Sequence, residues 1–160
     1  MMLPYETQRQ IELFLLHEAK LLDAGEFEAW LALYAPQGIY WMPSQPAQSD
    51  AKTVASIIYE DHAILAIRVR RLLEARALVL TPMPRTTHLV GNIEVTNAAG
   101  DAFTAEAAFI CIEHQGDDQR LYSGRQTHQL VRHNGSFRIE LKRVDLVDCD
   151  GRHTPITIPI

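Results

Sequence analysis

The spacing of hydrophobic residues changes about halfway along the chain. In the first half, apolar side chains recur every three or four positions, which is the spacing that lines one face of an α-helix. This spacing predicts helices over residues 8–22, 27–34 and 61–75, a short strand at residues 39–42 and a loop at residues 43–52. Gly25 should end the first helix, and Pro36 with Gly38 should end the second.

In the second half, extended segments rich in Val, Ile, Phe and Thr alternate with short stretches that favour turns. Strands are predicted at residues 86–96, 102–114, 121–132 and 137–147. The last connection contains Asn134-Gly135, the strongest two-residue hairpin signal. Successive hairpins after helices predict an α+β fold, in which three N-terminal helices pack on a strongly curved, mostly antiparallel sheet.

Length and composition narrow the class of protein. The chain has 160 residues, and we expect residues 1–160 to form a single domain. Its 15 basic and 20 acidic residues give a net charge of −5, which argues against a nucleic-acid partner because phosphate contacts need a basic face. The longest apolar run, residues 107–112, is far shorter than the roughly 20 residues of a membrane-spanning helix. With no signal peptide visible either, we expect a cytoplasmic protein without membrane contact.

The residue types that usually carry catalysis or bind metals form no recognisable motif. Seven histidines are present, but no two stand at positions i and i+4, the spacing of a zinc pair on a helix. Cys111 and Cys149 are not at metal spacing, and each is interpreted as a packed or incidental thiol. The sequence also lacks the Gly-x-Ser-x-Gly elbow and a glycine loop for phosphate. We therefore expect no catalytic residue, cofactor or metal in this chain.

The strand predicted at residues 121–132 departs from simple alternation, because polar residues stand on both of its faces. Arg125 lies on one face and His128 on the other. A central strand of this kind lines either a hydrated cavity or a subunit interface. Arg125 and His128 are therefore candidate interface residues.

A catalytic alternative stays open. If His88 and His128 point into a cone-shaped cavity beside Asp23 or Asp61, the site would suit general acid/base chemistry, as in a dehydratase or isomerase. We favour the interpretation in which both histidines form hydrogen bonds across strands or to a partner.

Two charged residues fall within the apolar faces of predicted helices. Glu18 lies between Phe14 and Leu22 on a helical wheel, and Arg68 lies in the same way beside Ile64. Buried charges are costly unless they are paired. We therefore expect Glu18 and Arg68 to form a structural ion pair.

The last residues of the sequence, 153–160, combine alternating isoleucines with two prolines. An extended segment would place Ile156, Ile158 and Ile160 on one side, while the prolines keep it out of a central strand. We expect this segment to dock along its own domain or across a subunit boundary, with the isoleucines as possible interface residues.

Several blocks of the sequence together resemble one family, the small (β) subunits of bacterial aromatic-ring-hydroxylating dioxygenases. The blocks occur in the order of that family and cover nearly the whole chain: residues 12–23, 27–34, Tyr40-Trp-Met-Pro43, Arg68-Val-Arg-Arg-Leu72, Pro84-Arg-Thr-Thr-His-Leu-Val-Gly-Asn92 and Tyr122-Ser-Gly-Arg125. Pro84 stands where the family more often has serine.

The resemblance implies a cone-like fold shared with nuclear transport factor 2 and scytalone dehydratase. It also implies partners: other β subunits and a large α subunit with a Rieske [2Fe-2S] cluster and a mononuclear Fe(II), commonly as α3β3, supplied by an electron-transfer ferredoxin and reductase. This chain would then be a structural subunit of an oxygenase that uses O2 and electrons from NAD(P)H, because the iron ligands of the family have no counterparts here. A free-standing cone-fold enzyme with His88 or His128 as base, and a small-molecule binding module, remain the alternatives.

Overall fold

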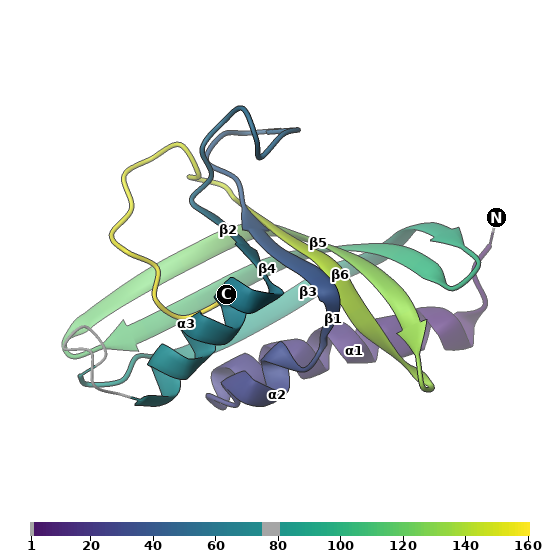
Figure 1. Ribbon diagram of the computed structural model, residues 1–160, viewed down its shortest axis with the longest axis horizontal. Helices are drawn as coiled ribbons and strands as arrows, with labels where there is room; N and C mark the ends of the chain where they lie inside the picture. Colours follow the sequence, from purple (N-terminus) through teal and green to yellow (C-terminus); the bar gives the residue numbers. More distant parts are fainter. Residues whose placement is uncertain (1, 75–80) are drawn as a thin grey trace.

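The computed structural model describes residues 2–74 and 81–160, and within them three helices lie against one face of a six-stranded sheet (Figure 1). The elements follow the chain as α1 (Tyr5–Asp23), α2 (Phe27–Leu31), β1 (Tyr34–Met42), β2 (Ile58–Asp61), α3 (His62–Glu74), β3 (Arg85–Ala99), β4 (Ala102–Gln115), β5 (Asp118–His133) and β6 (Ser136–Leu146). The predicted α+β class is confirmed.

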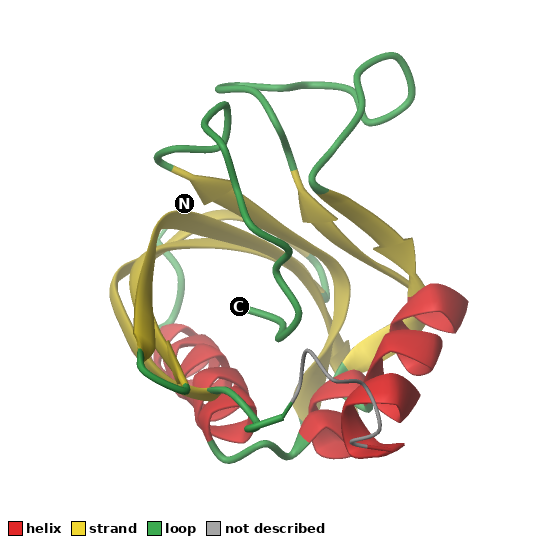
Figure 2. Cartoon of the chain, turned by 90° about the vertical axis from the view of Figure 1, so that its left-hand side faces the viewer, coloured by secondary structure: helices red, strands yellow, loops and turns green. Residues whose placement is uncertain are grey.

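The sheet has the strand order β2-β1-β6-β5-β4-β3, and every neighbouring pair is antiparallel except β1 and β6, which are parallel. Its strands curl over the helices, so that sheet and helices surround an interior into which the end of the chain descends (Figure 2). The predicted meander is therefore correct for β3 to β6. Strand β6, the last of the meander, also pairs with β1.

The second predicted helix was too long. The structure ends α2 at Leu31, and Tyr34 already pairs with Ile139 on β6. Pro36 and Gly38 lie in a register shift of β1 instead of at a helix end. A Cβ atom at Gly38 would come within 2.7 Å of the carbonyl oxygen of Ile139, so only glycine allows this close approach.

The hairpin predicted at Asn134-Gly135 is confirmed. Both residues have positive φ angles, 47° and 76°, as a type I′ turn requires. The segment predicted to dock lies along its own domain, and Ile158 and Ile160 are buried in the core as expected, whereas Ile156 is only partly buried. Strand β2 was not predicted, since four residues are too few to establish a period of two.

The core lies between the helices and the inner face of the sheet. Leu65, Val69 and Leu72 of α3 face it, whereas Ile64 and Leu73 are about half exposed, so the apolar face of this helix is narrower than predicted. Cys111 and Cys149 are free, buried thiols, as expected. Among the described residues, no helix is long and apolar enough to cross a membrane.

Candidate functional site

A buried cluster of charged side chains lies inside the cone, centred on Glu18. Glu18 projects from α1 and is 2% exposed. Its Oε2 atom lies 2.9 Å from Nε2 of His128 on β5, and its Oε1 atom accepts a hydrogen bond from Nζ of Lys142 on β6. His128 and Lys142 have no exposed surface. Helix α1 is thus bound to two neighbouring strands through a single carboxylate.

The electrostatics of this cluster favour an ionised Glu18. Burial by itself would raise the pKa of the carboxyl group, because the low-dielectric interior penalises its charge. The charge of Lys142, together with the charge and hydrogen bond of His128, outweighs burial and holds the pKa of Glu18 well below its usual range. The cluster is therefore a buried ion pair with a histidine as second partner.

The predicted pair of Glu18 with Arg68 is wrong, although the predicted burial of Glu18 is confirmed. Helix α2 packs against both α1 and α3, and Arg68 on α3 turns toward the neighbouring strand β2. There Nε of Arg68 lies 3.1 and 2.9 Å from the two carboxylate oxygens of Glu60. Sequence reasoning missed Glu60 because β2 was not predicted.

A second buried histidine joins the end of α1 to β3. Nδ1 of His88 lies 2.6 Å from Oδ1 of Asp23, and the backbone N–H of His88 donates to Oδ2 at 2.9 Å. The hydroxyl group of Thr86 donates to the same carboxylate at 3.0 Å. Burial lowers the pKa of His88 despite Asp23, which favours the neutral ring at neutral pH, with Nδ1–H as the donor to Asp23. Its Nε2 atom has no partner among the described residues.

The residues of the catalytic alternative do not form one site. In the register of the sheet, His88 pairs with Cys111 of β4 and His128 pairs with Ala105, six residues away on the same strand. Each histidine is bound to a different carboxylate of α1. Asp61 serves α3 instead: its Oδ1 atom accepts the backbone N–H of Ile64 at 3.0 Å, as an N-cap does.

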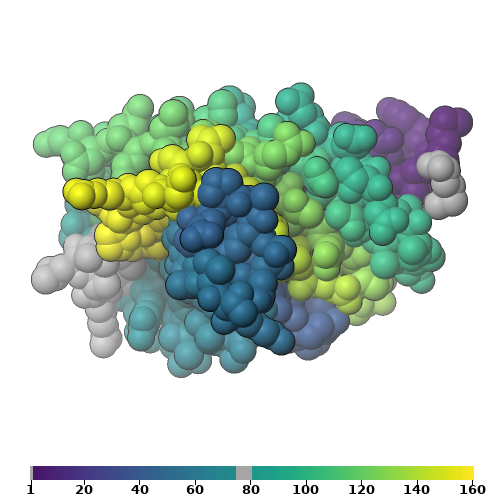
Figure 3. Space-filling model, turned by 90° about the horizontal axis from the view of Figure 1, so that it is seen from above, coloured from purple at the N-terminus to yellow at the C-terminus, as the bar shows by residue number. Residues whose placement is uncertain are grey.

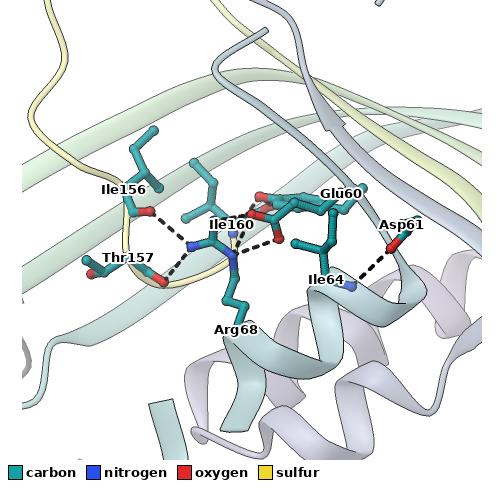
Figure 4. Close-up of polar contacts among 8 residues, drawn as sticks. Glu60, Asp61, Ile64, Arg68, Ile156, Thr157 and Ile160 are labelled. Carbon is teal, nitrogen blue, oxygen red and sulfur yellow. Dashed lines mark hydrogen bonds and ion pairs between the residues drawn. The ribbon is translucent and has the colours of Figure 1, made fainter. Parts of the chain in front are cut away.

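The end of the chain is held near Arg68 (Figure 4). Nη1 of Arg68 donates to the carbonyl oxygens of Ile156 and Thr157, at 3.4 and 3.3 Å. Ile158 and Ile160 are 2% and 0% exposed, and His128 is fully buried. These three side chains therefore have no surface to offer a partner, and their assignment as interface residues is wrong. Ile156 is partly buried and Arg125 is exposed.

The outer face of the sheet, turned away from the helices, carries the remaining polar candidates. Arg125 lies 3.8 Å from Glu106 on the neighbouring strand. An open hollow of about 1190 Å³ lies here, bordered by the sheet, by the loop between β1 and β2 and by the residues after β6. Seen from above, these last two segments lie side by side (Figure 3). Cross-strand aliphatic pairs, Leu89 with Ile110 and Ile112 with Leu121, are exposed on the same face.

Metal-binding groups are scattered in the described parts of the chain. No group of three or more His, Cys, Asp or Glu side chains in residues 2–74 and 81–160 is arranged to hold a metal ion. The buried charged groups instead bind one another, as Glu18 does with His128 and Lys142. Ion pairs thus attach α1 and α3 to the sheet.

Comparison with known proteins agrees with this picture. The profile of the family described as ring hydroxylating beta subunit matches residues 17–150. The small oxygenase component of the p-cumate 2,3-dioxygenase system of Pseudomonas putida is 33% identical over 141 residues, which are 87% of this chain and 78% of that protein. The β subunit of benzoate 1,2-dioxygenase of Acinetobacter baylyi is 36% identical over 96 residues, 57% of each chain.

A solved structure extends the comparison to the fold. The β subunit of benzoate 1,2-dioxygenase from Burkholderia mallei superimposes with a TM-score of 0.74 at 27% identity, over 91% of this chain and 95% of that one. Residues 17–150, which match the family profile, include both buried histidines and the carboxylates to which they are bound. The chain belongs to the family of ring-hydroxylating dioxygenase β subunits.

Proposed function

We propose that this chain is the structural small subunit of a multicomponent dioxygenase that acts on an aromatic compound, and that it supports assembly of the large subunit. Membership of the β-subunit family over residues 17–150 is the observation that carries this proposal. The related proteins are named as small components or β subunits of oxygenases, which implies a larger partner.

The interior of the chain is consistent with a supporting role. Both candidate histidines bind carboxylates of α1, and Ile158 and Ile160 are buried in the hydrophobic core. A general base must reach a substrate proton, directly or through one water molecule. The burial of His128 and the contact of its ring with Glu18 support a role in stabilising the fold.

The finer features of the complex are proposed from the resemblance to the family. The large subunit would hold a Rieske [2Fe-2S] cluster and a mononuclear Fe(II), and three copies of each chain would form α3β3. Electrons would reach it from NAD(P)H through a reductase and a ferredoxin, in the cytoplasm. Among residues 2–74 and 81–160, no group of three or more His, Cys, Asp or Glu side chains is arranged to hold a metal ion.

The test is co-expression with a large subunit sought in the neighbouring reading frames, followed by purification through a tag on this chain. We expect the two chains to copurify, with the iron in the large subunit. His88→Ala and His128→Ala should reduce turnover only as far as they reduce the amount of assembled complex. A loss of roughly a hundredfold per fully assembled and metallated complex is the low end for a lost general base, and it would favour the catalytic alternative.

A further inference from the structure

The last residues of the sequence, 154–160, are attached to the rest of the chain in an unusual way. In the described structure this segment belongs to no helix or strand, yet its last three residues are buried. Figure 2 shows it descending into the space between the sheet and the helices. Its backbone is therefore held by something other than strand pairing.

Arginine side chains from two different elements bind the carbonyl groups of the segment. Arg68 of α3 donates to the carbonyl oxygens of Ile156 and Thr157 (Figure 4). Arg120 of β5 donates to the carbonyl oxygen of Pro155 at 3.2 Å and to the hydroxyl group of Thr154 at 2.5 Å. Hydrogen bonds from charged donors are stronger than those between neutral groups.

A tyrosine of a third element binds the end of the segment. The hydroxyl group of Tyr40 on β1 donates to the carbonyl oxygen of Ile160 at 3.1 Å and accepts its backbone N–H at 3.2 Å. Ile158 and Ile160 meanwhile pack into the hydrophobic core. Polar side chains thus bind the backbone of the segment, and the hydrophobic core contacts its two isoleucine side chains.

The side chains that bind the segment are held in place by residues outside it. Both carboxylate oxygens of Glu60 bind Arg68. The carboxylate of buried Glu113 lies 3.4 Å from Nε of Arg120. The ring of Tyr40 packs edge-on against Trp30, with 5.9 Å between ring centroids. A site whose donors are already positioned loses little entropy when its ligand binds.

The segment is also suited to bind as a ligand. Pro155 and Pro159 fix φ, which limits the freedom the segment has to lose. Neither proline has an N–H group that would remain without a partner. The recognition resembles the binding of an extended peptide in a groove, with the peptide supplied by the same chain.

We propose that the space between the helices and the sheet is a binding site for an extended, proline-containing peptide with branched aliphatic side chains. Residues 154–160 are the occupant of this site in the folded chain. Arg68, Arg120 and Tyr40 recognise the peptide backbone, and Glu60 holds Arg68 in the binding position.

The experiment displaces residues 154–160 from the site in the full chain and then adds the same segment as a separate peptide. Ile158→Asp combined with Ile160→Asp should displace the segment, because two unpaired carboxylates cannot be buried cheaply. A fluorescent, C-terminally amidated peptide of residues 153–160 is then titrated into this double variant and into the wild-type chain, with anisotropy as the readout. Binding is expected for the double variant alone, since the wild-type segment competes at an effective concentration on the order of millimolar.

Matched substitutions on α3 test the recognition. Arg68→Ala, added to the double variant, should weaken peptide binding at least about tenfold because it removes two charge-assisted hydrogen bonds. Arg71→Ala, an exposed position on the same helix, should leave the affinity within about twofold, the change expected for a surface substitution. A peptide carrying the same two aspartates should not bind.

A folded double variant that fails to bind the peptide, or binds the aspartate peptide equally well, overturns the proposal. So does an Arg68→Ala effect no larger than that of Arg71→Ala. If the double variant is unfolded alone, its thermal transition with added peptide decides the matter. A restored cooperative transition supports the site, and an absent one refutes it.

Discussion

A single carboxylate, Glu18, holds α1 against two strands, and its environment determines what a substitution there should do. Glu18→Gln keeps the shape but leaves the charge of Lys142 buried without its partner. Stranding one member of a buried pair typically costs about 3 to 5 kcal/mol of unfolding free energy. Glu12→Gln on the same helix removes the partly exposed ion pair with Arg9, keeps an oxygen that can accept the hydrogen bond of Gln8, and should cost at most about 1 kcal/mol. Urea denaturation of both variants measures the difference.

A neutral His88 makes stability depend on pH. Because burial lowers its folded-state pKa, the unfolded chain binds the proton more readily. The contribution of His88 is complete above the ordinary histidine pKa of about 6.5 and is lost as the pH falls below it. His88→Asn can still donate to Asp23 but does not titrate. The wild type should therefore lose more unfolding free energy than this variant on moving from neutral to acidic pH.

Urea denaturation at a series of pH values, with both proteins in the same buffers, measures this difference. Equal slopes for the two proteins would show that His88 is not the group responsible. Glu18 also makes the unfolding free energy fall as the pH falls, but at lower pH. Its pKa is lowered in the folded chain, so its contribution to stability is lost once the carboxylate is protonated.

At the scale of elements, the close approach of β5 and β6 depends on Gly124. A Cβ atom there would lie 1.9 Å from the carbonyl oxygen of Asp145, so Gly124→Ala must push the strands apart. Overpacking of this kind costs about 1 to 3 kcal/mol. Gly91→Ala on β3 is the matched control, because nothing lies within 4 Å of its added carbon. Guanidinium denaturation should separate the two variants; equal midpoints would contradict the packing argument.

An irregularity of strand β6 explains why Lys142, one of the three residues of the buried cluster, was not predicted. Inward-facing residues of β6 are Phe137 and Ile139 and then Val144 and Leu146, so the alternation changes phase between them. A bulge opposite Gln129 and Leu130 causes the change and turns Lys142 inward. Strict alternation would have placed Lys142 on the solvent side. The phase change is visible in the sequence and was the available signal.

Helix faces, by contrast, were predictable where the pattern was long. The position of Glu18 within the apolar face of α1 correctly indicated its burial. Its partner could not be found in the same way, because a helical wheel gives the direction of a side chain but not which element lies there. Glu60 and Arg68 illustrate the same limit: they are eight residues apart, yet their contact depends on a four-residue strand without a usable period.

For the whole molecule, a partner subunit would contact exposed side chains, and the buried side chains of His128, Ile158 and Ile160 are not available to it. Arg125 on the outer face of the sheet remains our candidate contact. Arg125→Glu should weaken copurification with the large subunit or association between β subunits, while changing unfolding free energy by no more than about 0.5 kcal/mol, as surface substitutions usually do. Arg71→Glu, on the helical side, is the control.

Size-exclusion chromatography of the coexpressed chains, compared at equal concentration, measures this effect. An unchanged elution profile for Arg125→Glu would remove this residue from the interface. Reduced assembly by both variants alike would indicate a general effect of charge, since each replaces a positive side chain with a negative one.

The position of β6 between β1 and β5 has a consequence for the order in which the chain is completed during translation. Strand β1 leaves the ribosome about a hundred residues before the strand with which it pairs in parallel, so α1, α2 and β1 are synthesised long before their sheet exists. The meander β3 to β5 can form through local hairpins, but in the described sheet only β6 pairs it with β1, a strand of the N-terminal part. Long-range pairing of this kind is slow, and it leaves Trp30 and Tyr40 accessible to chaperones until the last quarter of the chain has been made.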